Sequence, residues 1–143
     1  MANLLCNGNY AVSGDAAACD AVQEIAKPDF KARMTVRLAV AGAFHTDFMK
    51  PAVESLGKVL ETVEFKAPRI PVVSNVDAAP HSDPATIKKL LMTQVTAPVQ
   101  WETTMNGMLG NGYKRGYELG PGKVITGILK RTDKTAVMEN VEV

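Results

Sequence analysis

The two histidines of this sequence are the side chains best suited to acid–base chemistry near neutral pH. His45 lies in Gly-Ala-Phe-His-Thr, at the point where a predicted strand ends and a predicted helix begins. Catalytic groups of open α/β folds gather at the carboxyl ends of strands, so His45 is a candidate general base, with a purely structural role as the alternative. His81 lies in the polar stretch Ala-Ala-Pro-His-Ser-Asp-Pro and is expected to be a solvated loop residue.

A general base needs a nucleophile to activate, and the sequence offers none in a suitable setting. An activated serine usually occupies a tight Gly-x-Ser-x-Gly turn, and no serine of this chain has that context. The serines are Ser13, Ser55, Ser74 and Ser82. Neither Cys6 nor Cys19 has a nearby cluster of cations that would favour its thiolate. The chain therefore carries a candidate base without its nucleophile.

Metal and phosphate sites are poorly supported by the spacing of their usual ligands. The two histidines are 36 positions apart and the two cysteines 13 apart, which matches no zinc pattern. Gly120-Pro121-Gly122-Lys123 fits neither phosphate-loop pattern and is interpreted as a turn from a strand into a helix. Backbone amides at the start of that helix leave an anion contact open.

The composition is that of a soluble globular protein of one ordinary domain: 143 residues, 46% hydrophobic and 22% charged. No apolar run approaches the ~20 residues needed to span a membrane. Sixteen basic and fifteen acidic residues nearly cancel, so nucleic acid is not an expected partner. Two cysteines form no disulfide framework and suit a reducing compartment.

The chain alternates strand and helix patterns. Residues Ala2–Cys6 and Asn9–Ser13 are predicted strands on either side of an Asn-Gly turn. A helix is predicted from a cap at Asp15 to Pro28, and Arg33–Val40 alternates like a half-buried strand. The predicted elements that follow are a helix with apolar positions from Met49 to Val63, a strand over Arg69–Val76, a helix starting at Asp83-Pro84, a helix through Trp101–Leu109, a strand over Tyr113–Leu119 and a helix through Val124–Leu129.

This pattern predicts an α/β fold with α+β pieces, but it supplies too few strands for a free-standing parallel sheet. The chain also begins directly with an apolar stretch after Met1. We therefore expect the sequence to be part of a longer polypeptide. A partial sheet would expose a strand edge and an apolar face, which favours aggregation or dimerisation.

Five segments, in this order and spacing, resemble one enzyme family. They are Asn9-Tyr10-Ala11-Val12-Ser13-Gly14, Ala41-Gly42-Ala43-Phe44-His45-Thr46, Pro71-Val72-Val73-Ser74-Asn75-Val76-Asp77, Pro98-Val99-Gln100-Trp101 and Glu118-Leu119-Gly120-Pro121-Gly122-Lys123-Val124. The order looks like the C-terminal half of malonyl-CoA:acyl carrier protein transacylase. The resemblance runs from Ala2 to about Arg131, and Ala32–Thr46 looks most like plastid or cyanobacterial members.

The resemblance implies parts of two subdomains. Residues 1–41 would be the latter part of an inserted ferredoxin-like small subdomain, and residues 42–143 the C-terminal part of an α/β-hydrolase-like large subdomain. The plastid stroma or the cytoplasm is the implied location.

The resemblance also implies ping-pong malonyl transfer from malonyl-CoA to the pantetheine thiol of acyl carrier protein, in fatty acid biosynthesis. His45 matches the catalytic histidine of the family. Gln100 matches the position whose backbone carbonyl orients that imidazole, and Asn3 matches an asparagine that lines the site. Malonyl-CoA and acyl carrier protein are the implied partners, and no cofactor or metal is implied, because CoA and phosphopantetheine enter as parts of the substrates.

The matched region departs from the family in several places. The Gly-His-Ser-Leu-Gly-type turn that carries the nucleophile lies upstream in the family and has no counterpart here. Leu5 and Asn7 replace a common asparagine and proline. The sequence therefore predicts an acyltransferase chain that is inactive alone. The alternative is a non-catalytic module that binds acyl carrier protein or a complementary N-terminal half.

Overall fold

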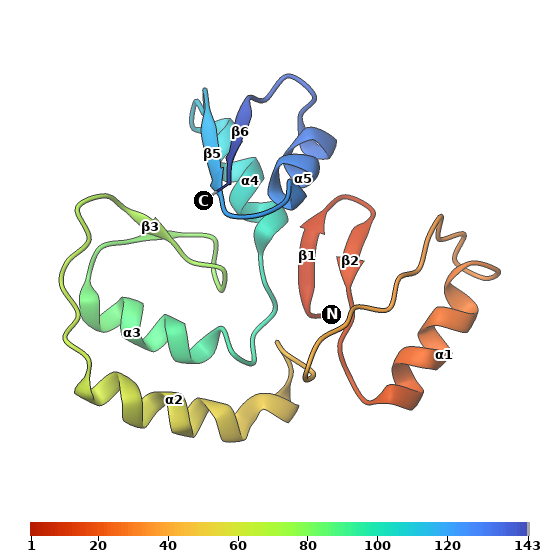
Figure 1. Ribbon diagram of the computed structural model, residues 1–143, viewed down its shortest axis with the longest axis horizontal. Helices are drawn as coiled ribbons and strands as arrows, with labels where there is room; N and C mark the ends of the chain where they lie inside the picture. Colours follow the sequence, from red (N-terminus) through yellow and green to blue (C-terminus); the bar gives the residue numbers. More distant parts are fainter. Residues whose placement is uncertain (143) are drawn as a thin grey trace.

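The computed structural model describes residues 1–142, and within them the chain forms five α-helices and three two-stranded sheets (Figure 1). In chain order the elements are β1 (Asn3–Cys6), β2 (Asn9–Ala11), α1 (Ala16–Ala26), a 3-10 turn η1 (Asp47–Met49), α2 (Lys50–Thr62), β3 (Val72–Val73), β4 (Pro80–His81), α3 (Pro84–Thr93), α4 (Trp101–Gly110), β5 (Gly116–Leu119), α5 (Val124–Thr132) and β6 (Met138–Val141). The predicted mixture of helices and strands is confirmed. No helix in this range is both long and apolar enough to cross a membrane.

The first hairpin forms as predicted, with Gly8 at a φ of 72° in the turn between β1 and β2. Such a φ suits glycine, which has no Cβ to clash. The other edge of β1 pairs with the segment after α3: Leu4 N–H donates to the Val99 carbonyl at 2.9 Å, and Val99 N–H donates to the Ala2 carbonyl at 2.8 Å. β1 is therefore the middle of three extended segments, two from the start of the chain and one from around Val99.

Two helices, α1 and α3, start where the sequence predicts because a side chain caps each of them. A carboxylate oxygen of Asp15 accepts the Ala18 N–H at 2.9 Å at the start of α1. Asp83 accepts the Thr86 N–H at 2.8 Å, and Pro84 opens α3. Each cap satisfies an amide that the helix itself leaves unpaired.

Two strand predictions are wrong. Arg33–Val40 forms no strand, and its apolar side chains at Met34, Val36, Leu38 and Val40 are 60–70% exposed. Of Arg69–Val76, only the two residues of β3 pair, in a short antiparallel hairpin with β4. A strand needs hydrogen bonds from a neighbour, and within residues 1–142 no segment supplies them.

The last third holds a packed cluster of buried apolar side chains. Buried Met105, Leu129 and Ala136 pack together from α4, α5 and the loop before β6. The C-terminal tail, predicted only as weakly patterned, supplies β6, which pairs with β5 in parallel. The parallel pairing joins the two strands across the α5 connection.

The Gly-Pro-Gly-Lys turn enters α5 above a buried carboxylate. Glu118, only 8% exposed, accepts the Ile125 N–H and the Thr126 N–H at 2.9 Å each and the Thr126 hydroxyl at 2.7 Å. The Thr126 hydroxyl, followed by these amides, holds the pKa of Glu118 below its ordinary value. The chain's own carboxylate thus occupies the helix start that the sequence left open for an external anion.

We expect Glu118→Ala to loosen the first turn of α5, because the Ile125 and Thr126 amides lose their acceptor. Hydrogen exchange should show these two amides exchanging about tenfold faster at pH 7, the usual scale for a lost helix cap. The lowered pKa means that the charged form stabilises the fold above the ordinary value of 4.5, and that this stabilisation disappears as pH falls through the folded-state pKa. The difference in exchange rate between variant and parent should therefore shrink as the pH falls toward the folded-state pKa of Glu118. Glu139→Ala, on the exposed face of β6, is the control, and equal exchange in both variants would contradict the assignment.

Candidate functional site

His45 lies in a tight turn that leads into η1. Its φ of 63° is in the left-handed region, which residues other than glycine seldom occupy. Thr46 holds the turn: its hydroxyl donates to the Ala43 carbonyl at 2.6 Å and accepts the Phe48 N–H at 3.3 Å. The His45 N–H donates to the Val95 carbonyl at 3.0 Å. Since Arg33–Val40 is not a strand, the expected strand end before His45 is a loop instead.

The imidazole of His45 is partly buried against the end of α3. Its Nδ1 lies 2.9 Å from the Gln94 carbonyl and 3.1 Å from the Ala97 carbonyl. Carbonyl oxygens only accept hydrogen bonds, so Nδ1 must carry the hydrogen in the neutral ring. The lone pair is then on Nε2, which makes that atom the basic one.

The carbonyls at Nδ1 correct the prediction for Gln100. Gln94 is the C-cap of α3, and the last carbonyls of a helix have no partner within it, so they are available to an imidazole. Gln100 precedes α4, and its carbonyl accepts the Thr104 N–H at 3.0 Å as the first bond of that helix. Gln94, with Ala97, therefore takes the place expected of Gln100. Backbone carbonyls leave no signature in side-chain type, so the sequence did not indicate Gln94 or Ala97.

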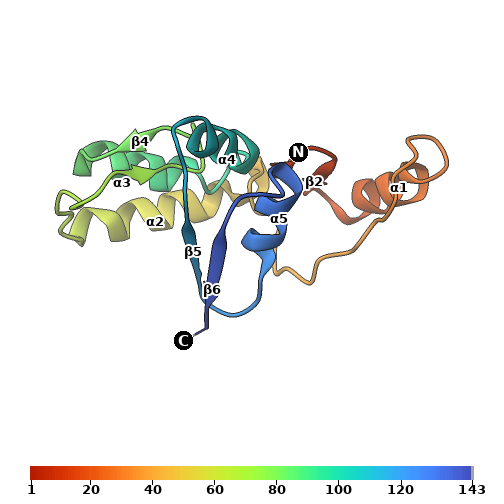
Figure 2. The same ribbon diagram turned by 90° about the horizontal axis from the view of Figure 1, so that it is seen from above.

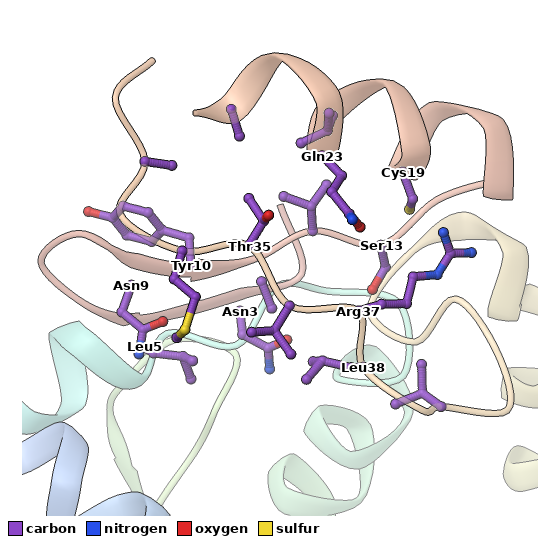
Figure 3. A pocket seen from close by; sticks show the side chains of 18 of the residues that line it. Asn3, Leu5, Asn9, Tyr10, Ser13, Cys19, Gln23, Thr35, Arg37 and Leu38 are labelled. Atoms are coloured by element: carbon purple, nitrogen blue, oxygen red, sulfur yellow. The ribbon is translucent and has the colours of Figure 1, made fainter. Parts of the chain in front are cut away.

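Asn3 and His45 both line one hollow of about 720 Å³. Figure 3 shows this hollow between the first hairpin, α1 and the extended segment of residues 32–40, with Gln23 and Cys19 reaching in from α1 and Asn3 and Leu5 from β1. Gln100 does not line it. The structure thus brings two of the three residues singled out in the sequence to one cavity.

Arg37 is a lining residue that sequence analysis missed. Its guanidinium forms an ion pair with Asp20 on α1, with both side chains more than half exposed. The sequence pattern places Arg37 on the polar face of a predicted strand and gives no indication of a contact with α1. The pair ties the extended segment to α1.

The described residues supply a candidate general base, His45, but no nucleophile bonded to it. Within residues 1–142, no hydroxyl or thiol forms a hydrogen bond with His45. The same range contains no cluster of three or more His, Cys, Asp or Glu side chains that could hold a metal ion. His81, expected in a loop, is in β4, where its Nε2 lies 3.0 Å from an Asp77 carboxylate oxygen.

Comparisons with known proteins agree on one kind of enzyme, although no family model matches the chain. The chain is 37% identical over 134 residues to the malonyl CoA-acyl carrier protein transacylase of Bacillus subtilis. This alignment covers 94% of this chain and 42% of the Bacillus protein. It superposes on an acyl-carrier-protein-S-malonyltransferase from Bartonella henselae with a TM-score of 0.92 and 36% identity, covering 100% of this chain and 45% of the other. A malonyl-transacylase solved in complex with its type II PKS acyl carrier protein gives a TM-score of 0.87 at 31% identity, with 99% of this chain and 45% of the other covered. The chain spans less than half the length of each of these proteins.

The two histidines should differ in tautomer, because one is held through Nδ1 and the other through Nε2. In nitrogen–proton correlation spectra near pH 8, neutral His45 should carry its hydrogen on Nδ1. His81 should carry its hydrogen on Nε2, toward Asp77, and serves as the internal control. A neutral His45 protonated on Nε2 would rule out the carbonyl arrangement described above.

Proposed function

We propose that this chain, which matches malonyl-CoA:acyl carrier protein transacylases in sequence and fold along most of its own length, supplies the histidine part of such an acyltransferase site. The reaction would be malonyl transfer from malonyl-CoA to the pantetheine thiol of acyl carrier protein, as a step of fatty acid biosynthesis. The observation that carries the proposal is the pair of carbonyls at Nδ1 of His45, since they leave Nε2 free to accept a proton.

In the first half-reaction, His45 acts on a serine supplied by polypeptide outside this sequence. Nε2 takes the serine proton as the serine oxygen bonds to the thioester carbon of malonyl-CoA. The resulting imidazolium then gives that proton to the departing CoA thiolate, which leaves a malonyl-serine ester and free CoA. The Gln94 and Ala97 carbonyls keep the ring oriented throughout, as a carboxylate does in other triads.

The second half-reaction reverses these roles. Nε2 takes the proton of the pantetheine thiol, and the thiolate bonds to the ester carbon. His45 then returns the proton to the serine oxygen as that bond breaks. Asn3 lines the same hollow as His45, which would let it contact the substrate in both halves.

The proposal also assigns the chain to two subdomains. Residues 1–41 belong to a ferredoxin-like small subdomain, and residues 42–143 to an α/β-hydrolase-like large subdomain. The paired β1–β2 hairpin followed by α1 suits the first assignment, and the parallel β5–α5–β6 unit suits the second. A reducing compartment suits Cys6 and Cys19, both of which are free thiols.

Replacing His45 should abolish transfer in a chimera in which this chain takes the place of the matching part of the Bacillus subtilis transacylase. Malonyl transfer to acyl carrier protein should fall about 10²–10⁴-fold for His45→Ala, the usual contribution of a general base. His81→Ala is the matched control, since His81 contacts Asp77 rather than the hollow, and should keep full activity. An active His45→Ala chimera would refute the role of this histidine.

The chain alone should not form an acyl-enzyme, because no nucleophile contacts His45. After incubation with radiolabelled malonyl-CoA and denaturation, we expect no label on the chain, while the full-length Bacillus protein should label. Stable label on the chain would overturn this expectation and direct attention to Ser13, which also lines the hollow.

The non-catalytic alternative remains open to a direct test, because the chain has a base but no bonded nucleophile. If the chain binds acyl carrier protein by itself, adding the carrier protein should shift amide signals around the hollow. An absence of shifts at high carrier concentration would exclude that alternative.

A further inference from the structure

His45 keeps a backbone conformation that its own side chain disfavours. Its φ of 63° lies in the left-handed region, where the Cβ of a residue other than glycine comes too close to the following carbonyl oxygen. Such a conformation persists only where the surrounding bonds outweigh its cost, and these conformations cluster at active sites. The bonds that hold this turn therefore decide where the imidazole lies.

One set of bonds comes from the end of α3. The Val95 carbonyl accepts the His45 N–H at 3.0 Å. The Gln94 and Ala97 carbonyls lie 2.9 and 3.1 Å from Nδ1 of the same residue. Helices α2 and α3 run side by side, so the end of α3 lies next to the turn that leads into α2 (Figure 2). All three bonds form only when the turn presents both the amide and the ring of His45 to this helix end.

A second set of bonds comes from the Thr46 hydroxyl, which closes the turn on both sides of His45. It donates to the Ala43 carbonyl at 2.6 Å and accepts the Phe48 N–H at 3.3 Å. A hydroxyl has one hydrogen to donate, and the Ala43 carbonyl takes it. Among the described residues, those that line the hollow do not include Thr46. Its hydroxyl is therefore engaged within the turn, where it acts on the histidine and not on a substrate.

We propose that Thr46 is a positioning residue for proton transfer by His45. Its two hydrogen bonds keep the His45 backbone left-handed, so that Nδ1 meets the end of α3 and Nε2 is left for the reacting groups. This inference rests on the proposed function. Without the hydroxyl, the backbone of His45 relaxes toward an ordinary φ, and the imidazole moves away from the carbonyls at the end of α3. A displacement of about 1 Å can slow a reaction about 10²-fold, so even a small relaxation has a measurable effect.

Four variants separate the hydroxyl of Thr46 from the rest of its side chain. Thr46→Val keeps the shape of the side chain and loses both hydrogen bonds, and Thr46→Ala loses them without the bulk of valine. Thr46→Ser keeps the hydroxyl and should behave as the parent. Thr62→Val is the matched control, because the Thr62 hydroxyl makes the same kind of bond at the end of α2, to the Val59 carbonyl three residues back at 2.8 Å.

The first measurement is the tautomer of His45 in this chain near pH 8, by nitrogen–proton correlation spectra. In Thr46→Val and Thr46→Ala, the ratio of Nε2-protonated to Nδ1-protonated imidazole should rise about tenfold, the usual scale for losing one hydrogen bond. In Thr46→Ser and Thr62→Val the ratio should stay that of the parent. Circular dichroism equal to that of the parent shows that a variant keeps the fold, so the change in tautomer reports on the turn itself.

The second measurement is malonyl transfer in the chimera with the Bacillus subtilis transacylase. For Thr46→Val, kcat and kcat/KM for malonyl-CoA should fall together, about tenfold each, as expected when the lost interaction acts in the transition state. Thr46→Ser should restore both constants. A residue with a merely structural role would lower the thermal stability of the chimera and leave both constants of the folded enzyme unchanged.

Three results would overturn the proposal. They are a parent-like tautomer ratio in both hydroxyl-free variants, a Thr46→Ser chain that behaves as Thr46→Val does, and an effect of Thr46→Val that is confined to KM. If the chimera transfers no malonyl group even with Thr46 in place, while the tautomer of the chain changes as expected, the result supports the role of Thr46 in the turn. That result counts against the proposed function alone.

Discussion

The contact between Nδ1 of His45 and the carbonyls at the end of α3 is the constraint on which the arrangement of this chain depends. The seven residues from Gln94 to Gln100 follow that helix, and they bond in three directions. They hold the imidazole and the His45 amide, they pair with β1 through Val99, and they bond to Asn75 through the Gln100 amide at 2.7 Å. A short irregular segment thus joins the first hairpin, the histidine turn and the start of α4.

This joint explains why Asn3 and His45 reach one hollow although 41 residues separate them. β1 is fixed by bonds to Val99, and His45 is fixed by bonds to Gln94, Val95 and Ala97. The strain of a left-handed backbone at His45 is supported by these bonds and by the Thr46 turn. The hollow is therefore a product of backbone hydrogen bonds, whereas its other wall, formed by α1 and the extended segment, is tied by one exposed ion pair.

The helices of the chain were predictable and several of its strands were not. Asp15 and Asp83 each satisfy helix amides with their own side chains, so those helix starts are encoded within four residues. The alternating apolar residues Met34, Val36, Leu38 and Val40 favour a strand. Within the described residues no neighbouring strand pairs with this segment, so it stays unpaired. β6 was missed for the opposite reason, because its weak pattern is outweighed by pairing with β5.

The sequence by itself determined the starts of α1 and α3, the hairpin turn at Gly8, the lack of a nucleophile in a suitable turn and the choice of His45 as a candidate base, while the family resemblance added Asn3. Only the tertiary structure decided which carbonyls meet the imidazole, which nitrogen carries the proton, and that Glu118 fills the start of α5. The physical reason is the range of the interactions. Caps and turns act between residues a few positions apart, whereas backbone carbonyls and strand edges acquire partners only when distant segments pack together.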